Sequence, residues 1–199
     1  MSKPTFPTRK SLQQVRRMRP NPSLNHRTRY GGPVSSNVRP HKMPSPQFEG
    51  LLLVHGGTHL PAVVTRAATL DTANPIDQNG GKYVLLVASE EKTPNLSVAR
   101  ARKWIEAGAA FVCTWGPSCQ DLEELFDYAA FSPELGEPIP FTVMTTSHQN
   151  ENLDEALWFA FYTAFAPEDL PSPLSSVVVL VDSVSLEARC TKWIETNHE

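Results

Sequence analysis

Two short segments carry side chains that can do chemistry. In CTWGPSCQD, Cys119 and Asp121 follow a Trp-Gly-Pro turn, and in TTSHQNE, Glu151 comes three residues after His148. A cysteine at the start of a helix can be held as a thiolate by the helix dipole, and a histidine can act as its base. One reading is therefore a Cys/His-dependent hydrolase or transferase, with Cys119 as nucleophile and His148 as base.

The same side chains also suit a binding site without catalysis. Trp115 ends an apolar run and can present its ring edge to a ligand beside Cys119, Asp121, His148 and Glu151. Each residue also has a purely structural interpretation, as a helix cap, a turn or a polar loop. We expect a small ligand or a protein partner to bind at these five residues, and catalysis is the alternative.

Motifs for a cofactor or a metal do not accompany these residues. The HGGTH segment at 55–59 has two glycines but lacks the G-x-G-x-x-G spacing of a phosphate-binding loop. A zinc site at His148 would be short of ligands, because neither a second histidine nor a Cys-x-x-Cys pair lies near it. We therefore expect neither a cofactor nor a bound metal.

Alternating strand and helix patterns must position these residues. Four apolar runs, each typical of a buried strand, precede four segments with helical spacing, and a further short strand is predicted at 51–54. This alternation predicts an α/β fold, flavodoxin-like or Rossmann-like, with a small parallel sheet of four to five strands and helices on both faces. The strands are expected at 83–88, 110–115, 141–146 and 176–182, and the helices at 97–108, 118–131, 152–165 and 185–195.

The expected strand order places the site. A flavodoxin-like order of 2-1-3-4 for these four strands puts the ligand crevice between 83–88 and 141–146, at their carboxyl ends. Strand 83–88 would then separate the loop of Cys119 from that of His148, so this order does not favour their contact. Trp158 and Trp193 lie on apolar helix faces, and we expect both to be packed in the core.

Charge divides the chain into two parts. Residues 1–50 carry ten Lys/Arg, one acid and eight of the 18 prolines, whereas the rest holds eight basic and twenty acidic residues. Such a Pro/Arg-rich segment has too few apolar groups to offset the entropy of ordering it. We predict a disordered basic tail at 1–48, an arm and loop at 49–82 and the α/β domain at 83–199.

The basic tail has several interpretations. It can contact nucleic-acid phosphates, which makes a nucleic-acid-associated protein the second alternative function. It can also meet an anionic membrane surface, direct the chain to an organelle, be cleaved, be a solvated tail or reflect a misassigned start. An apolar run of the 18–20 residues needed to span a bilayer is missing, and three cysteines do not make a disulfide framework, so we expect a cytoplasmic protein.

Two longer motifs resemble a family of small bacterial α/β domains of unknown function. They are W-I-x-x-G-x-x-F-V-C-T-W-G-x-x-C-x-D, from Trp104 to Asp121, and F-T-V-M-T-T-S-H-x-x-E-x-L-x-E-A-L-W-F-A, from Phe141 to Ala160. The resemblance covers about residues 58–185 and leaves out the basic tail. It implies the α/β fold and the location of the site, and it brings no established activity.

This chain departs from the family pattern at two places. Ser147 precedes the histidine where the family has an aromatic residue, and the turn after the cysteine has Leu122, Glu123 and Glu124 where the family has a tryptophan and two aspartates. If those aromatic residues form a ligand wall in the relatives, the wall is thinner in this chain.

Overall fold

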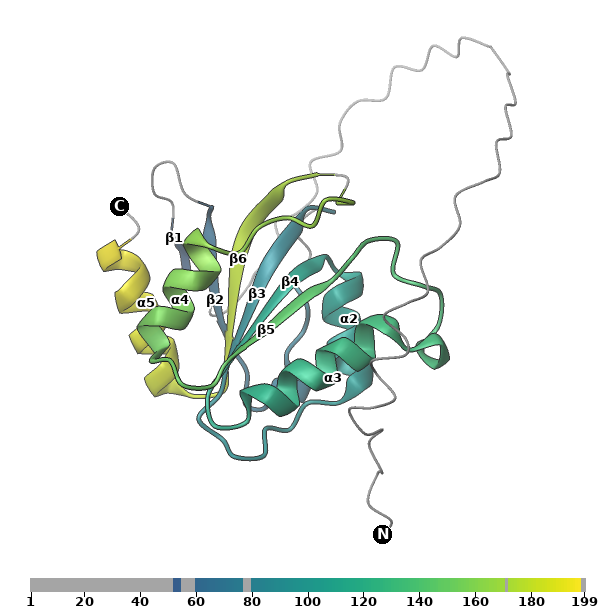
Figure 1. Ribbon diagram of the computed structural model, residues 1–199. Coiled ribbons are helices and arrows are strands. Elements are labelled where there is room, and N and C mark those ends of the chain that lie inside the picture. Colours follow the sequence, from purple (N-terminus) through teal and green to yellow (C-terminus); the bar gives the residue numbers. More distant parts are fainter. Residues whose placement is uncertain (1–51, 55–59, 77–79, 171, 198–199) are drawn as a thin grey trace, which may run out of the picture. The chain divides into compact units, whose positions relative to one another are not determined.

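The computed structural model describes residues 52–54, 60–76, 80–170 and 172–197, and the fold of this part is an α/β sandwich (Figure 1). The predicted tail at 1–48 and part of the predicted arm at 49–82 lie outside the described residues. The expected nucleic-acid contact of the tail therefore stays a prediction.

The described strands form one sheet with the order β1-β2-β6-β3-β4-β5. β1 pairs antiparallel with β2, and all other neighbours pair in parallel. The predicted parallel sheet is confirmed, with one antiparallel strand added at its edge. The strands are β1 (Leu52–Val54), β2 (Ala62–Arg66), β3 (Lys82–Ala88), β4 (Ala109–Trp115), β5 (Met144–His148) and β6 (Leu174–Val181).

Helices cover both faces of the sheet, as the alternation predicts. In Figure 1, α2 and α3 lie on one face, and α4 and α5 lie on the other. Two short 3-10 helices, η1 and η2, lie in connecting loops. The bounds are α2 (Val98–Glu106), α3 (Cys119–Phe131), α4 (Leu153–Tyr162), α5 (Val184–Asn197), η1 (Leu70–Thr72) and η2 (Pro133–Leu135).

The predicted strand order 2-1-3-4 is wrong. β3 lies between β6 and β4, and β5 pairs with β4. The chain steps outward from β3 to β4 to β5 through α2 and α3 on one face, and α4 then returns it across the other face to β6. The predicted crevice between 83–88 and 141–146 is therefore absent, because β4 fills that position.

Part of the predicted arm belongs to the sheet. The short run AVVTR forms β2, which inserts between β1 and β6 in the sheet. Its five residues are too few to be distinguished by periodicity from an apolar loop, and this strand was not predicted. β1 and β2 thus extend the sheet on the side of β6.

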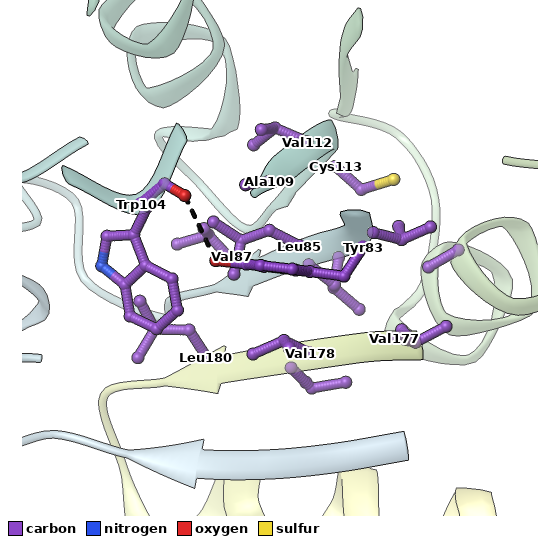
Figure 2. Close-up of a cluster of buried hydrophobic side chains, with 14 of the residues drawn as sticks. Tyr83, Leu85, Val87, Trp104, Ala109, Val112, Cys113, Val177, Val178 and Leu180 are labelled. Carbon is purple, nitrogen blue, oxygen red and sulfur yellow. Dashed lines mark hydrogen bonds between the residues drawn. The ribbon is translucent and has the colours of Figure 1, made fainter. Parts of the chain in front are cut away.

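The centre of the core lies on β3 and β6, which are buried on both faces because helices pack against each face. Figure 2 shows Tyr83 of β3 with its hydroxyl toward Trp104 of α2, where it donates a hydrogen bond to the backbone carbonyl (3.2 Å). Both side chains are fully buried. This contact joins α2 to the sheet at the point where α2 ends.

Local capping signals in the sequence set the starts of two helices. The Ser97 hydroxyl accepts a hydrogen bond from the backbone N–H of Arg100 (3.3 Å) at the start of α2. At α4, Asn152 accepts from the backbone N–H of Glu155 (2.9 Å), and the Glu155 carboxylate accepts from that of Asn152 (2.8 Å). Ser118 behaves differently at α3, because its hydroxyl donates to the carbonyl of Lys92 instead of capping the helix.

Candidate functional site

The carboxyl edge of the sheet is strongly acidic. Four of its segments follow β3, β4, β5 and β6, at 89–97, 116–121, 149–155 and 182–187, and the end of β2 with Arg66 lies at the same edge. These four segments contain one basic residue, Lys92. Their acidic residues are Glu90, Glu91, Asp121, Glu151, Asp154, Glu155, Asp182 and Glu187.

Three of the five predicted site residues are in contact at this edge. Trp115 and His148 are paired at the ends of β4 and β5. The Nδ1 atom of His148 lies 2.7 Å from Oε2 of Glu151, and Nε1 of Trp115 donates to the backbone carbonyl of Glu151 (3.0 Å). The ring of His148 packs edge-to-face on Phe159 of α4 with 4.8 Å between the centroids, and the Arg189 guanidinium lies 5.8 Å from the centroid of the Trp115 ring.

Cys119 lies next to this cluster but on the other face of the sheet. It is the first residue of α3, whereas the His148 ring packs against α4. The preceding strand residue, Ser147, points to α3 and donates to the Glu123 carboxylate (2.6 Å), so the alternation of β5 directs His148 away from α3. Among the described residues, neither ring nitrogen of His148 is hydrogen-bonded to the Cys119 sulfur: Nδ1 contacts Glu151, and Nε2 is buried without a partner.

The environment of Cys119 does not activate the thiol. Burial raises its pKa above the ordinary value and outweighs the backbone N–H groups of Gln120 and His148, which lower the pKa. The helix start therefore does not produce the thiolate that a nucleophilic cysteine requires.

Asp121 is placed apart from the cluster. It is exposed in the first turn of α3, and its carboxylate makes no hydrogen bond or salt bridge with another described residue. A neighbouring polar contact bridges α3 and the loop after β5, where the Gln120 amide donates to that of Gln149 (2.8 Å). Asp121 thus adds charge to the edge without joining Trp115, His148 and Glu151.

We expect the native protein to react slowly with thiol reagents. All three cysteines are buried, and burial raises the pKa of Cys190 to about 12 and that of Cys113 further. At pH 7.5, the absorbance change with a disulfide reagent such as DTNB should develop only with unfolding, and three equivalents should react in denaturant. If one thiol of the native protein reacts fast with DTNB, and this reaction is lost in Cys119→Ala, the prediction is wrong and the nucleophile hypothesis for Cys119 is supported.

A groove between α4 and α5 begins at Glu151. Its volume is about 640 Å³. We call it the acidic groove, because three carboxylates, three aromatic rings and two amides line it: Glu151, Asp154, Glu155, Trp158, Phe159, Trp193, Asn152 and Asn197. A smaller hollow of about 300 Å³ shares Asp154, Trp193 and Asn197 with it and adds Arg189, Lys192 and Thr196.

The prediction that Trp158 is packed in the core is wrong, since the residue is 56% exposed. α4 buries Leu157 and Phe161 toward the sheet and leaves Trp158 on its outer side, where the ring lies 5.9 Å from that of Tyr162. Trp193 is partly buried and packs on Phe161 (5.6 Å between the centroids). The sequence does contain a signal for this exposed surface. Trp158 and Tyr162 are four residues apart, so they share one side of α4, separate from the buried side of Leu157 and Phe161.

The carboxylates of the acidic groove differ in their partners. Glu151 contacts His148, and Glu155 accepts the backbone N–H of Asn152. The Asp154 side chain makes no hydrogen bond or salt bridge with another residue in the described part of the chain. Groups of three or more His, Cys, Asp or Glu side chains arranged to hold a metal are not found among the described residues. The described helices include none that is long and apolar enough to cross a membrane.

Comparison with known proteins gives one result that bears on identity. No curated protein matches the chain. A family described as a domain of unknown function, DUF7684, matches residues 58–197. This range contains β2 through α5, the Trp115, His148 and Glu151 cluster and every residue of the acidic groove. The predicted membership of a family of unknown function is therefore confirmed, and the chain belongs to the DUF7684 family.

Proposed function

We propose that the protein is a binding module that recognises a small ligand or a protein partner at the carboxyl edge of the sheet, through the acidic groove. The observation that carries this proposal is the groove itself, which combines about 640 Å³ of space with a Trp158 ring that is 56% exposed. Ligand sites in proteins usually have aromatic linings with a few polar groups.

The cluster behind the groove supports this proposal. Glu151 lines the groove, and its side chain and backbone are held by His148 and Trp115 respectively. Phe159 lines the groove as well and contacts the His148 ring. Because both wall residues are held by contacts to the ends of β4 and β5, the wall is preorganised, which reduces the entropy lost on binding.

The placement of Cys119 and His148 favours binding over catalysis. A nucleophile and its base must lie within hydrogen-bond reach, or come within reach when substrate binds. Here the thiol lies on the α3 side and the imidazole on the α4 side of β5, with the His148 Nδ1 atom engaged by Glu151. The role that this arrangement supports for His148 is to orient Glu151 at the edge of the groove.

The four tryptophans provide a direct test. In the full chain labelled with 5-fluorotryptophan, each residue gives a separate ¹⁹F resonance that Trp→Phe variants can assign. Trp158 and Trp193 line the acidic groove and Trp115 lies behind it, whereas Trp104 is fully buried. We expect compounds from a library of cationic, anionic and neutral fragments to shift the resonances of Trp158 and Trp193 and to leave that of Trp104 unchanged.

Phe131 offers the matched control surface. It is 56% exposed, as Trp158 is, but it ends α3 on the opposite face of the sheet. Trp158→Ala should abolish the Trp193 shift, and Phe131→Ala should preserve it. The proposal fails if the library contains no compound that shifts Trp158 and Trp193, or if the shifts survive in Trp158→Ala.

A further inference from the structure

The acidic groove contains a carboxylate and an aromatic ring arranged to receive a cation. Asp154 and Trp158 are four residues apart on α4, so their side chains leave the helix on the same side, about 5–6 Å apart at Cβ. Asp154 has no hydrogen-bond or salt-bridge partner among the described residues, and the Trp158 ring is 56% exposed. A positive group between them would pair with the carboxylate and lie against the ring face.

The charge around the groove favours the same kind of ligand. The groove itself is lined by three carboxylates and no basic side chain, whereas Arg189 and Lys192 line the adjoining hollow. Such a surface attracts cations and repels anions over distances of about a Debye length, which is about 8 Å at physiological ionic strength.

The helix start that faces the groove is partly occupied by its own side chains. The backbone N–H of Glu155 is bonded to the Asn152 side chain, and the N–H of Asn152 is bonded to the Glu155 carboxylate. Both residues line the groove, so these two donors at the start of the helix are already used.

The basic residues near the groove do not neutralise Asp154. Arg189 pairs with the Glu90 carboxylate (3.0 Å) and lies over Trp115. Lys192 lines the smaller hollow with Asp154, but the two form no salt bridge in the described part of the chain. The negative charge of Asp154 thus remains open to a ligand.

We infer that the acidic groove binds an arginine- or lysine-bearing segment of a partner protein, with the cationic head between Asp154 and Trp158. This inference rests on the proposed function and names the class of partner for the same groove. A polypeptide fits better than a lone amine, because the groove continues into the hollow that Arg189 and Lys192 also line, which leaves room for several residues beyond the cationic one. The long aliphatic stems of lysine and arginine would pack on the tryptophan rings.

The test uses the full fluorotryptophan-labelled chain and three capped hexapeptides, of arginine, serine and glutamate. We expect the arginine peptide to shift the Trp158 and Trp193 resonances at lower concentration than the serine peptide, and the glutamate peptide to have no effect. Raising the salt concentration from 50 to 500 mM should weaken the arginine complex, because screening reduces the attraction between exposed charges.

Two variants that each remove one negative charge distinguish binding in the groove from a general effect of the protein's charge. Asp154→Asn should weaken binding of the arginine peptide about threefold to tenfold. Glu124→Gln should leave it unchanged, because Glu124 is exposed on α3, on the opposite face of the sheet. An equal effect of the two variants would overturn the inference.

The peptide series also distinguishes the two proposals. If the serine and glutamate peptides shift Trp158 as strongly as the arginine peptide, the cationic partner is wrong while the groove remains a binding site. If the arginine peptide leaves the Trp158 and Trp193 resonances unchanged, the inference fails independently of the fragment result.

Discussion

Alanine in place of Gly116 is expected to destabilise the folded protein by about 4 kcal/mol or more, which is among the largest effects of single substitutions. A Cβ atom at this position would lie 1.8 Å from the backbone oxygen of Ser89. That oxygen cannot move away easily, because the Ser89 N–H bonds to the carbonyl of Trp115 (3.1 Å) and its hydroxyl bonds to Asp182. Urea denaturation followed by far-ultraviolet circular dichroism measures the loss.

Gly136 is the matched control for this substitution. Its φ of 115° is nearly the same as the 116° of Gly116, but a Cβ atom there would have nothing within 4 Å. Gly136→Ala should therefore cost the backbone strain alone, about 1–3 kcal/mol. If the two variants lose the same free energy of unfolding, the contact with Ser89 is not the cause, and β3 and β4 are not as closely joined as the structure indicates.

Methionine in place of Arg102 is expected to reduce the free energy of unfolding by about 2–4 kcal/mol. Arg102 is 5% exposed, and its guanidinium donates to the carbonyls of Ala129 (3.1 Å) and Glu137 and to the carboxylate of Glu106 (2.8 Å). Methionine keeps most of the volume but leaves the buried Ala129 carbonyl without a donor. The change should appear in urea denaturation as a lower midpoint with an unchanged slope.

Arg100 on the same helix provides the control. It is partly exposed, and its guanidinium lies 3.4 Å from the Asn74 side chain. Arg100→Met should change the free energy of unfolding by no more than about 0.5 kcal/mol. Equal losses for the two variants would show that methionine acts through the helix itself, and that the contacts of Arg102 to α3 and the following loop contribute little.

Much of the local structure could be predicted because its causes lie close together in the sequence. The run YVLLVA is apolar without interruption, as a strand covered on both faces must be, and it forms β3. Asn152 and Glu155 are three residues apart, which is the spacing of a capping box, and they start α4. Neither inference needs knowledge of what the element packs against.

The assembly of the site was predicted less well, because it depends on contacts between segments far apart in the chain. The alternation of strands and helices does not tell on which side of a strand the next parallel strand is added. The predicted order, in which a strand separates Cys119 from His148, was therefore as consistent with the sequence as the observed one. In the structure β4 and β5 are neighbours, which pairs Trp115 with His148. The thiol still does not meet the imidazole, because their side chains lie on opposite faces of the sheet.

Trp158 also shows that local sequence does not decide tertiary packing, because a residue predicted to lie in the core is exposed. A tryptophan among apolar residues on a helix favours burial, and α4 is apolar on more than one side. Which side is buried depends on where α5 and the sheet lie. They take the side of Leu157 and Phe161, and this leaves Trp158 at the groove.

The sequence by itself determined the α/β class, the family, the capping of α2 and α4 and the acidic segments that follow the strands, since composition and short-range spacing control these. The tertiary structure alone decided the strand order, the inclusion of β2, the contact of Trp115 and His148 with Glu151, and the exposure of Trp158. The physical reason is that these features come from packing between distant segments, where many arrangements satisfy the same local preferences and only the complete core selects one.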